Sequence, residues 1–294
     1  LVGDHKQLPP VVTADNALTS YVERCALQTE ENDPNTKPPN SAEASRRLYD
    51  RRLLEISGVR GLDTSLFERL TGCVPTTRLN IQYRMSQRIM AFSSRSFYDS
   101  DLRAADDVAH LQLPMHREAL KKLPRRIEAI LDPSRPMVLV DVHGQEHRRQ
   151  NVEEATVVLD VLEALLQGEV VTDRSGPRPL ALDELPTQIG VISPFRAQVQ
   201  LLRQMLDKRL QGYAAHVDID TVDRFQGGEK EIILVSFVAS DRESLFLADA
   251  RRLNVTLTRA KSKLVVFGNL ATLGLISEHF QNLIRMPESF IVRA

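Results

Sequence analysis

From about Pro136 onward the chain alternates short apolar runs with amphipathic segments, and this alternation is the feature that most limits its possible folds. Near-continuous runs of Val, Ile and Leu are typical of parallel strands that helices cover on both faces. The runs are PMVLVDV (136–142), QIGVIS (188–193), VDIDTV (217–222), EIILVSFV (231–238) and KLVVFGN (263–269). They predict an α/β fold with a doubly wound parallel sheet, whose ligands would bind at the carboxyl ends of the strands.

Two segments between these runs have the pattern of amphipathic crossover helices. The first, 151–167, has Asn151 as a candidate N-cap and glutamates in its first turn. Its core-facing stripe contains Val158, Val161, Leu162, Leu165 and Leu166. The second, 193–210, has Ser193 as a candidate N-cap and Pro194 at the first helical position. Its inward-facing positions are Val199, Leu202, Leu206 and Leu210.

Charge and composition exclude several classes of protein. The 294 residues carry a net charge of −1, so any contact with a polyanion must come from a local groove. No run of about 20 apolar residues exists that could span a bilayer, and no signal-peptide pattern opens the chain. These features predict an intracellular protein that does not enter a membrane. Cys25 and Cys73 have no metal-site spacing, so we expect two reduced thiols.

An insertion is expected near the beginning of the chain, at about 13–60. Within it, the stretch 29–45 is polar, rich in Pro and Asn, and free of apolar periodicity. The following segment, 46–55, is basic and helical in pattern. It is predicted to be a solvated helix face, with a nucleic-acid contact as the alternative.

Five short motifs carry the functional information when they are read together. They are GDHKQLPP (3–10), LNIQYRM (79–85), IGVISPFRAQ (189–198), DTVDRFQGGEKE (220–231) and RRLNVTLTRAKSKLVVFGN (251–269). In order and spacing they resemble the later motifs of superfamily 1, subgroup B helicases, which include the nonsense-mediated-decay RNA helicase and the Okazaki-fragment nuclease-helicase. The resemblance implies a RecA-like P-loop NTPase fold and an ATP-dependent helicase. It is nearest to the nuclease-helicase branch and therefore favours DNA over RNA.

The resemblance also implies roles at an ATP site between two domains. Arg84 and Arg259 resemble the two arginines that reach the γ-phosphate from the second domain, a task that suits the fixed charge of guanidinium. The alternative for each is a surface salt bridge. Gln7 resembles the glutamine that senses the γ-phosphate or its attacking water, with a simple turn residue as the alternative.

Three further residues match positions near the nucleoside. Tyr83 resembles the aromatic residue that stacks on adenine, and the alternative is a core tyrosine with a buried hydroxyl. Glu229 matches a glutamate that contacts the ribose, while a helix-capping or solvated carboxylate is the alternative. Gly227, just before it, would permit close approach of the backbone.

Ser193, Pro194 and Thr221 resemble positions that grip the sugar-phosphate strand of single-stranded DNA or RNA. Such contacts fix register without reading bases, so binding should be sequence-independent and sensitive to salt. Ser193 and Pro194 could equally be only a helix start. His143 and His147 are predicted to lie in a loop, and no protein metal site is expected.

A helicase of this kind also needs the phosphate-binding loop G-x-x-x-x-G-K-[ST], but none of the 13 glycines here is followed by Lys. Residues 1–74 are therefore expected to be the C-terminal remnant of a first RecA-like domain. Residues 75–294 would be a nearly complete second domain, which supplies its arginines to ATP and Mg²⁺ held elsewhere. The parent protein is predicted to move 5′ to 3′ on single-stranded DNA, and this chain alone to be inactive. The alternatives are a non-catalytic nucleic-acid-binding module, an inactive fragment, or an unrelated α/β nucleotide-binding protein.

Overall fold

The computed structural model describes residues 4, 6–7, 75–168, 170–173, 176–178, 188–225, 227–238, 247 and 249–294. The chain divides into two compact units, Leu1–Arg78 and Leu79–Ala294. The second unit contains nearly all the described residues. The expected insertion at 13–60, its basic segment 46–55 and both cysteines lie outside them.

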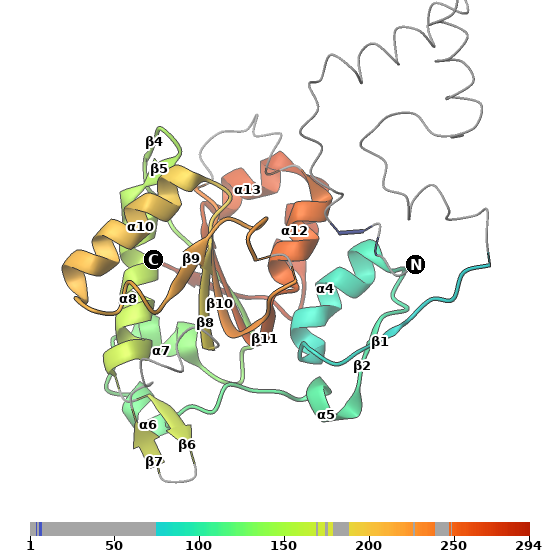
Figure 1. Ribbon diagram of the computed structural model, residues 1–294, viewed down its shortest axis with the longest axis horizontal. Coiled ribbons are helices and arrows are strands. Elements are labelled where there is room, and N and C mark those ends of the chain that lie inside the picture. The colour runs from blue at the N-terminus through green and yellow to red at the C-terminus, as the bar shows by residue number, and fades with distance from the viewer. Residues whose placement is uncertain are drawn as a thin grey trace, which may run out of the picture. The chain divides into compact units, whose positions relative to one another are not determined.

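The second unit is built on one six-stranded sheet in which every neighbouring pair of strands is parallel (Figure 1). In spatial order the strands are β12 (Phe290–Arg293), β3 (Met137–Asp141), β11 (Ala260–Gly268), β10 (Lys230–Ser236), β8 (Ile189–Ile192) and β9 (Asp218–Asp220). The five predicted strands are confirmed, with small differences at their ends. The edge strand β12 was not predicted, because it is short and half of it faces solvent.

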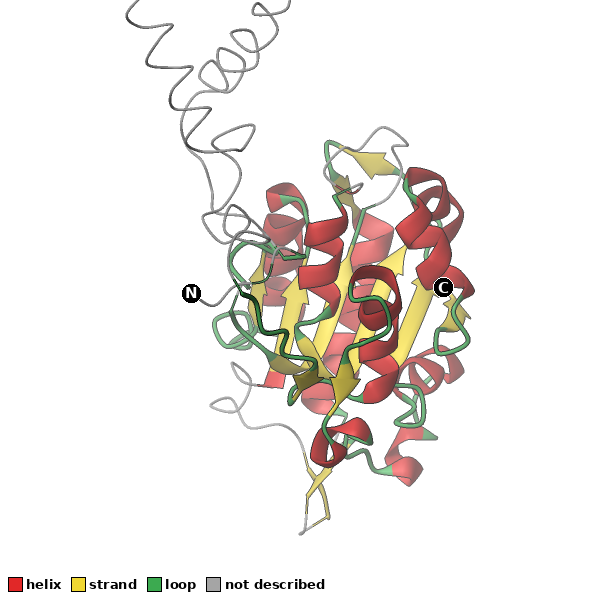
Figure 2. Ribbon diagram, turned by 90° about the vertical axis from the view of Figure 1, so that its right-hand side faces the viewer, coloured by secondary structure: helices red, strands yellow, loops and turns green. Residues whose placement is uncertain are grey.

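Helices cover both faces of this sheet, as the side view shows (Figure 2). One face is covered by α7 (Arg125–Leu131), α8 (Val152–Gln167) and α10 (Arg196–Arg209). The other is covered by α4 (Gln87–Phe97), α12 (Ala250–Leu257), α13 (Leu270–Ile276) and α14 (Glu278–Arg285). Because both faces are covered, successive strand residues such as Val138 and Leu139 are equally buried. The predicted α/β, RecA-like architecture is confirmed.

Helix α8 begins where the sequence predicts. The side-chain oxygen of Asn151 accepts a hydrogen bond from the backbone N–H of Glu154 at 2.9 Å, which satisfies a donor that the helix leaves free. All five residues of the predicted stripe are buried. The prediction for α8 is therefore confirmed in both its start and its orientation.

The predicted start of α10 is wrong by two residues. The helix begins at Arg196, with Phe195 at the N-cap, so Ser193 does not cap it and Pro194 is not its first residue. The reason is that the backbone N–H of Ser193 donates to Asp220 O at 3.2 Å, which continues the pairing of β8 with β9 by one residue. Ser193 therefore extends the pairing of the two strands by one hydrogen bond and does not begin the helix. The four predicted inward positions are all buried: Val199, Leu202, Leu206 and Leu210.

The remaining elements are short. A two-residue parallel pair joins β1 (Ile81–Gln82) to β2 (Arg103–Ala104), and two hairpins join β4 (Glu146–His147) to β5 (Gln150–Asn151) and β6 (Val171–Asp173) to β7 (Gly176–Arg178). Two single-turn helices are α5 (Asp106–Ala109) and α6 (Arg117–Leu120). His143 lies in a loop as predicted, whereas His147 lies in β4. Within the described ranges, no helix has the length and apolar character needed to cross a bilayer.

Candidate functional site

The candidate residues fall at two opposite edges of the sheet. Glu229 directly precedes β10 and Arg259 directly precedes β11, so both lie at the amino edge. Ser193 directly follows β8 and Thr221 directly follows β9, so both lie at the carboxyl edge. Arg259 and its neighbours therefore lie at the edge opposite to the carboxyl ends, where the sequence predicts ligands to bind. The physical reason is that these motifs occupy the loops that enter their strands.

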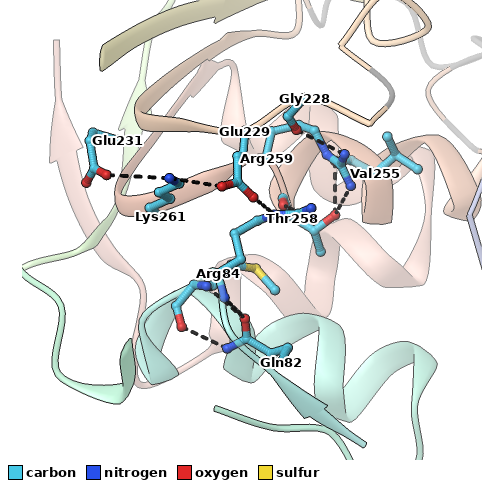
Figure 3. A network of polar contacts seen from close by, with 10 residues as sticks. Gln82, Arg84, Gly228, Glu229, Glu231, Val255, Thr258, Arg259 and Lys261 are labelled. Carbon is cyan, nitrogen blue, oxygen red and sulfur yellow. Dashed lines mark hydrogen bonds and ion pairs between the residues drawn. The ribbon is translucent and has the colours of Figure 1, made fainter. Parts of the chain in front are cut away.

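At the amino edge, Gln82 shapes the turn that presents Arg84. Its Oε1 accepts hydrogen bonds from the backbone N–H groups of Arg84 and Met85, each at 2.8 Å. Its Nε2 donates to Met85 O at 2.8 Å. Three hydrogen bonds from one side chain close the turn after β1, and the Arg84 side chain extends from it toward Glu229 (Figure 3).

Glu229 lies between two cations. Arg84 Nε donates to Glu229 Oε2 at 2.6 Å, and Lys261 Nζ lies 2.9 Å from Oε1. The Arg84 and Lys261 hydrogen bonds hold the pKa of the Glu229 carboxyl below its usual range. Arg84 Nη1 also donates to Thr258 O at 3.2 Å. Glu229 is thus an ion-paired carboxylate that connects the turn after β1 to the start of β11.

Arg259 lies beside this group but is only 1% exposed. Its Nε donates to Val255 O at 2.9 Å, its Nη1 to Gly228 O at 3.1 Å and its Nη2 to Thr258 Oγ1 at 3.1 Å (Figure 3). All three acceptors are neutral oxygens. Burial, together with the nearby charge of Arg84, lowers the pKa of Arg259 to about 10. A cation is therefore buried here without a carboxylate among its hydrogen-bond acceptors.

Tyr83 and Gly227 flank the cluster in the sequence. The Tyr83 side chain is 70% exposed, so the alternative of a core tyrosine with a buried hydroxyl is wrong. Gly227 has a φ of +83°, a left-handed conformation that glycine adopts without steric cost. Its requirement for glycine therefore comes from the backbone turn before Glu229.

Gln7 lies in the first unit, Leu1–Arg78, and its contacts are given within that unit alone. Its backbone N–H donates to Asp4 O at 3.2 Å, and its Nε2 donates to Asp4 Oδ2 at 2.9 Å. Asp4 Oδ1 also accepts from the backbone N–H of Lys6 at 2.9 Å. Gln7 is therefore part of a turn that Asp4 closes.

At the carboxyl edge, the two candidate hydroxyls are largely covered. Ser193 is fully buried, and its Oγ accepts from the backbone N–H of Phe195 at 3.4 Å. Thr221 is 8% exposed, and its backbone N–H donates to Asp220 Oδ1 at 2.7 Å. Pro194, between the strand end and α10, is partly exposed. This edge therefore presents backbone and ring atoms more than hydroxyl groups.

A buried polar network below this edge was not predicted. Glu154 Oε1 accepts from Ser236 Oγ at 2.6 Å and from the backbone N–H of Val238 at 3.0 Å. Gln198 Nε2 donates to Ser236 Oγ and to Asn151 O, both at 3.1 Å. Burial raises the pKa of Glu154 to about 7, against the effect of these hydrogen bonds. The network ties α8 and α10 to the end of β10.

Some of the missed residues had a signal in the sequence and others had none. Glu154 precedes Val158, Val161 and Leu165 by four, seven and eleven positions, so it stands on the apolar stripe of α8 and not only in its first turn. That position could have identified it as buried. Gln82, Thr258 and Lys261 follow no periodic pattern, and only their tertiary contacts reveal their roles.

Comparison with known proteins identifies the family of the chain. The AAA domain family matches residues 62–271. The chain is 30% identical over 279 residues to an uncharacterized ATP-dependent helicase of Methanocaldococcus jannaschii, covering 92% of this chain and 32% of that protein. It is 31% identical over 280 residues to the DNA polymerase alpha-associated DNA helicase A of Saccharomyces cerevisiae, covering 93% and 34%.

A third relative is the DNA replication ATP-dependent helicase/nuclease DNA2 of Xenopus laevis, 32% identical over 289 residues, which cover 93% of this chain and 22% of that protein. The chain thus spans about a third or less of the length of these curated relatives. The matched family region contains four of the five motifs and the whole arginine cluster. The chain therefore belongs to the AAA domain family and, within it, to the superfamily 1 helicases.

Proposed function

We propose that residues 75–294 act as the second RecA-like domain of an ATP-dependent helicase, in which Arg84 and Arg259 contact the γ-phosphate of ATP. The observation that carries this proposal is the burial of Arg259 beside Arg84 with only neutral hydrogen-bond acceptors. Burying a cation without a counterion costs free energy, and a second cation nearby adds to that cost. A polyphosphate would supply the anionic acceptor that Arg259 lacks and a second anion for Arg84 beside Glu229.

The two arginines would act in different ways. Arg84 is partly exposed and already directed by Glu229, so it can exchange its contact with Thr258 O for a phosphate oxygen. Arg259 would exchange its neutral acceptors for phosphate when the two helicase domains close on the nucleotide. Fixed guanidinium groups of this kind stabilise the charge that develops during phosphoryl transfer.

Other residues would complete the nucleotide site. The exposed ring of Tyr83 is proposed to stack on adenine, and Glu229 to reach the ribose beyond the turn that Gly227 permits. From residues 1–74, proposed to be the C-terminal part of the first RecA-like domain, Gln7 would sense the γ-phosphate or its attacking water. ATP supplies the phosphoanhydride bond whose hydrolysis drives the cycle.

Mg²⁺ is expected to accompany ATP, with ligands in the part of the helicase that carries the phosphate-binding loop. This sequence has no Gly-Lys pair with which to form that loop. We therefore expect the 294-residue chain by itself to be inactive in ATP hydrolysis, and a longer protein that joins it to such a loop to be active.

The carboxyl edge is proposed to hold the nucleic acid, through backbone atoms near Ser193, the ring of Pro194 and the segment that begins at Thr221. Contacts there would go to the sugar-phosphate strand and not to bases, because backbone N–H groups can donate to phosphate oxygens without reading the sequence. The proposed substrate is single-stranded DNA, bound independently of sequence, along which the helicase would move 5′ to 3′.

The experiment that tests this function measures ATP hydrolysis stimulated by single-stranded DNA in the longer protein. Arg84→Ala should lower turnover about 1,000-fold, in the range seen for arginines that contact a transferred phosphate, with little change in nucleotide binding. The matched control is Arg88→Ala, since the Arg88 guanidinium is exposed and donates to Ser134 O. Unchanged turnover in Arg84→Ala would contradict the proposal.

A further inference from the structure

The β4–β5 hairpin carries two arginines in an unusual conformation. Its two-residue turn consists of Arg148 and Arg149, which have φ values of 51° and 64°. Positive φ at both central positions is the mark of a type I′ turn, for which Asn-Gly is the preferred sequence. Arginine is disfavoured at positive φ, so this turn is less stable than one formed by Asn-Gly. It places two long cationic side chains at its tip.

The hairpin is fixed onto the first turn of α10. Gln150 Nε2 donates to Ala197 O at 2.9 Å, and the backbone N–H of Asn151 donates to Gln198 Oε1 at 2.9 Å. The Arg149 guanidinium lies 5.1 Å from the centre of the Phe195 ring. The tip therefore stands beside Phe195, three residues after the end of β8 at Ile192, at the carboxyl edge of the sheet.

No described residue neutralises the positive charges of Arg148 and Arg149 at this tip. Arg148 and Arg149 are both exposed, and neither forms an ion pair with a described residue. The nearby carboxylate of Glu146 accepts from the backbone N–H of Arg149 and not from its guanidinium. Arg196, at the start of α10, is also exposed. Exposed guanidinium groups beside one edge that form no ion pair with a described residue favour a polyanionic partner.

We propose that Arg148 and Arg149 form an additional contact for the phosphate backbone of a single-stranded polynucleotide that lies along the carboxyl edge. This inference rests on the proposed function and extends its binding site from Pro194 to the hairpin tip. Arginine suits the task because its planar guanidinium can donate two hydrogen bonds to one phosphate. Phosphodiester groups are common to DNA and RNA, so the contact should not distinguish them.

The test measures binding of oligo-dT and oligo-rU of equal length to the full chain over a range of salt concentrations. In the variant Arg148→Asn/Arg149→Gly, the turn receives its preferred residues while both charges are removed. Its melting temperature should stay the same or rise, while affinity for both oligonucleotides falls about tenfold at low salt. The slope of log affinity against log salt should become shallower by about 1.4, or about 0.7 for each phosphate that the protein no longer neutralises.

Two controls make this result specific. Arg148→Lys/Arg149→Lys keeps the charge and should keep most of the salt slope. Lys122→Gln/Arg125→Gln removes two exposed cations at and just before the start of α7 and should leave affinity within about twofold of the unmodified chain. An equal loss of affinity in this second control would overturn the inference.

The two proposals fail in different ways. If the unmodified chain binds both oligonucleotides and Arg148→Asn/Arg149→Gly binds them as tightly, the hairpin contact is wrong and the proposed carboxyl edge remains. If the unmodified chain shows no salt-dependent binding to either oligonucleotide, the proposed strand-binding edge is wrong and the hairpin contact falls with it.

Discussion

Arg84 and Glu229, separated by 145 residues in the sequence, form an ion pair with 2.6 Å between Nε and Oε2. The other carboxylate oxygen of Glu229 is 2.9 Å from Lys261 Nζ. One carboxylate therefore holds two cations from different parts of the chain. This contact sets the direction in which Arg84 points at the amino edge of the sheet.

Replacing Glu229 by Gln should lower ATP turnover of the longer protein about 100-fold, since a catalytic group loses its orientation. The free energy of unfolding should change by less than about 1 kcal/mol because the pair is partly exposed. Steady-state kinetics distinguish two roles. A lower kcat with little change in KM indicates that Glu229 positions Arg84, whereas a higher KM indicates a ribose contact. Glu288→Gln, which breaks the Arg95 ion pair, is the matched control and should leave kcat unchanged.

Arg259 should not be replaceable by Lys. A single ammonium group cannot span Val255 O, Gly228 O and Thr258 Oγ1, which the guanidinium reaches together. We expect Arg259→Lys and Arg259→Ala to lose turnover alike in the longer protein. The free energy of unfolding of Arg259→Ala should be lower by about 1–3 kcal/mol. Near-normal turnover in Arg259→Lys, measured beside urea denaturation, would contradict the proposed phosphate contact.

Tyr83→Ala should weaken nucleotide binding by the longer protein about tenfold without loss of stability. The exposed ring contributes little to the core, so the free energy of unfolding should change by less than about 0.5 kcal/mol. Tyr83→Phe keeps the stacking surface and should bind normally. Titration with ATP and GTP checks this prediction. Because any base offers a face for stacking, weaker binding of only one nucleotide would argue against it.

Glu154 should make the chain less stable as the pH rises. Its carboxyl has a pKa of about 7 when folded and of 4.5 as the ordinary value, so the folded state binds more protons between these limits. The free energy of unfolding should therefore fall by about 3 kcal/mol from pH 4.5 to pH 7, at about 1.4 kcal/mol for each pH unit. Denaturation of Glu154→Gln should lack this decrease. Glu153→Gln, one residue earlier and exposed, should retain it.

Lys263 should have the opposite effect over a higher pH range. Burial lowers its pKa to about 7 from 10.5, while its Nζ donates to Asp132 O at 3.0 Å and Arg135 O at 2.7 Å. The unfolded state binds more protons between these pKa values, so the free energy of unfolding should rise by about 4 kcal/mol from pH 7 to pH 10. Lys263→Met should abolish this rise, whereas the exposed Lys208→Met should preserve it. A rise that persists in Lys263→Met would show that another group causes it.

Local chemistry made much of the fold predictable. The Val, Ile and Leu runs of β3, β8, β10 and β11 indicate buried parallel strands because both faces of those strands are covered. Asn151 caps α8 because a side-chain oxygen at that position reaches a backbone N–H within the same turn. Such signals involve residues close in the sequence, so they can be recognised without knowing the tertiary structure.

The failed prediction at Ser193 shows where local reasoning ends. Serine before proline matches a helix start, but the backbone of Ser193 hydrogen-bonds to Asp220 on the neighbouring strand. A strand partner 27 residues away therefore determined where α10 begins. The buried position of Glu154 was missed for a different reason: its place on the apolar stripe of α8 was a local signal, but glutamate in a first turn is ordinarily explained by the helix dipole.

By itself the sequence determined the order of the motifs, the helicase family that they indicate and the parallel sheet that carries them. Only the tertiary structure decided that Arg84 pairs with Glu229, that Arg259 is buried, and that the two groups of candidate residues lie at opposite edges. The Arg84–Glu229 pair joins segments 145 residues apart, and the burial of Arg259 depends on which atoms the packed chain hides from water. Whether a charged side chain is exposed, buried or paired depends on the folded chain, and no motif specifies it.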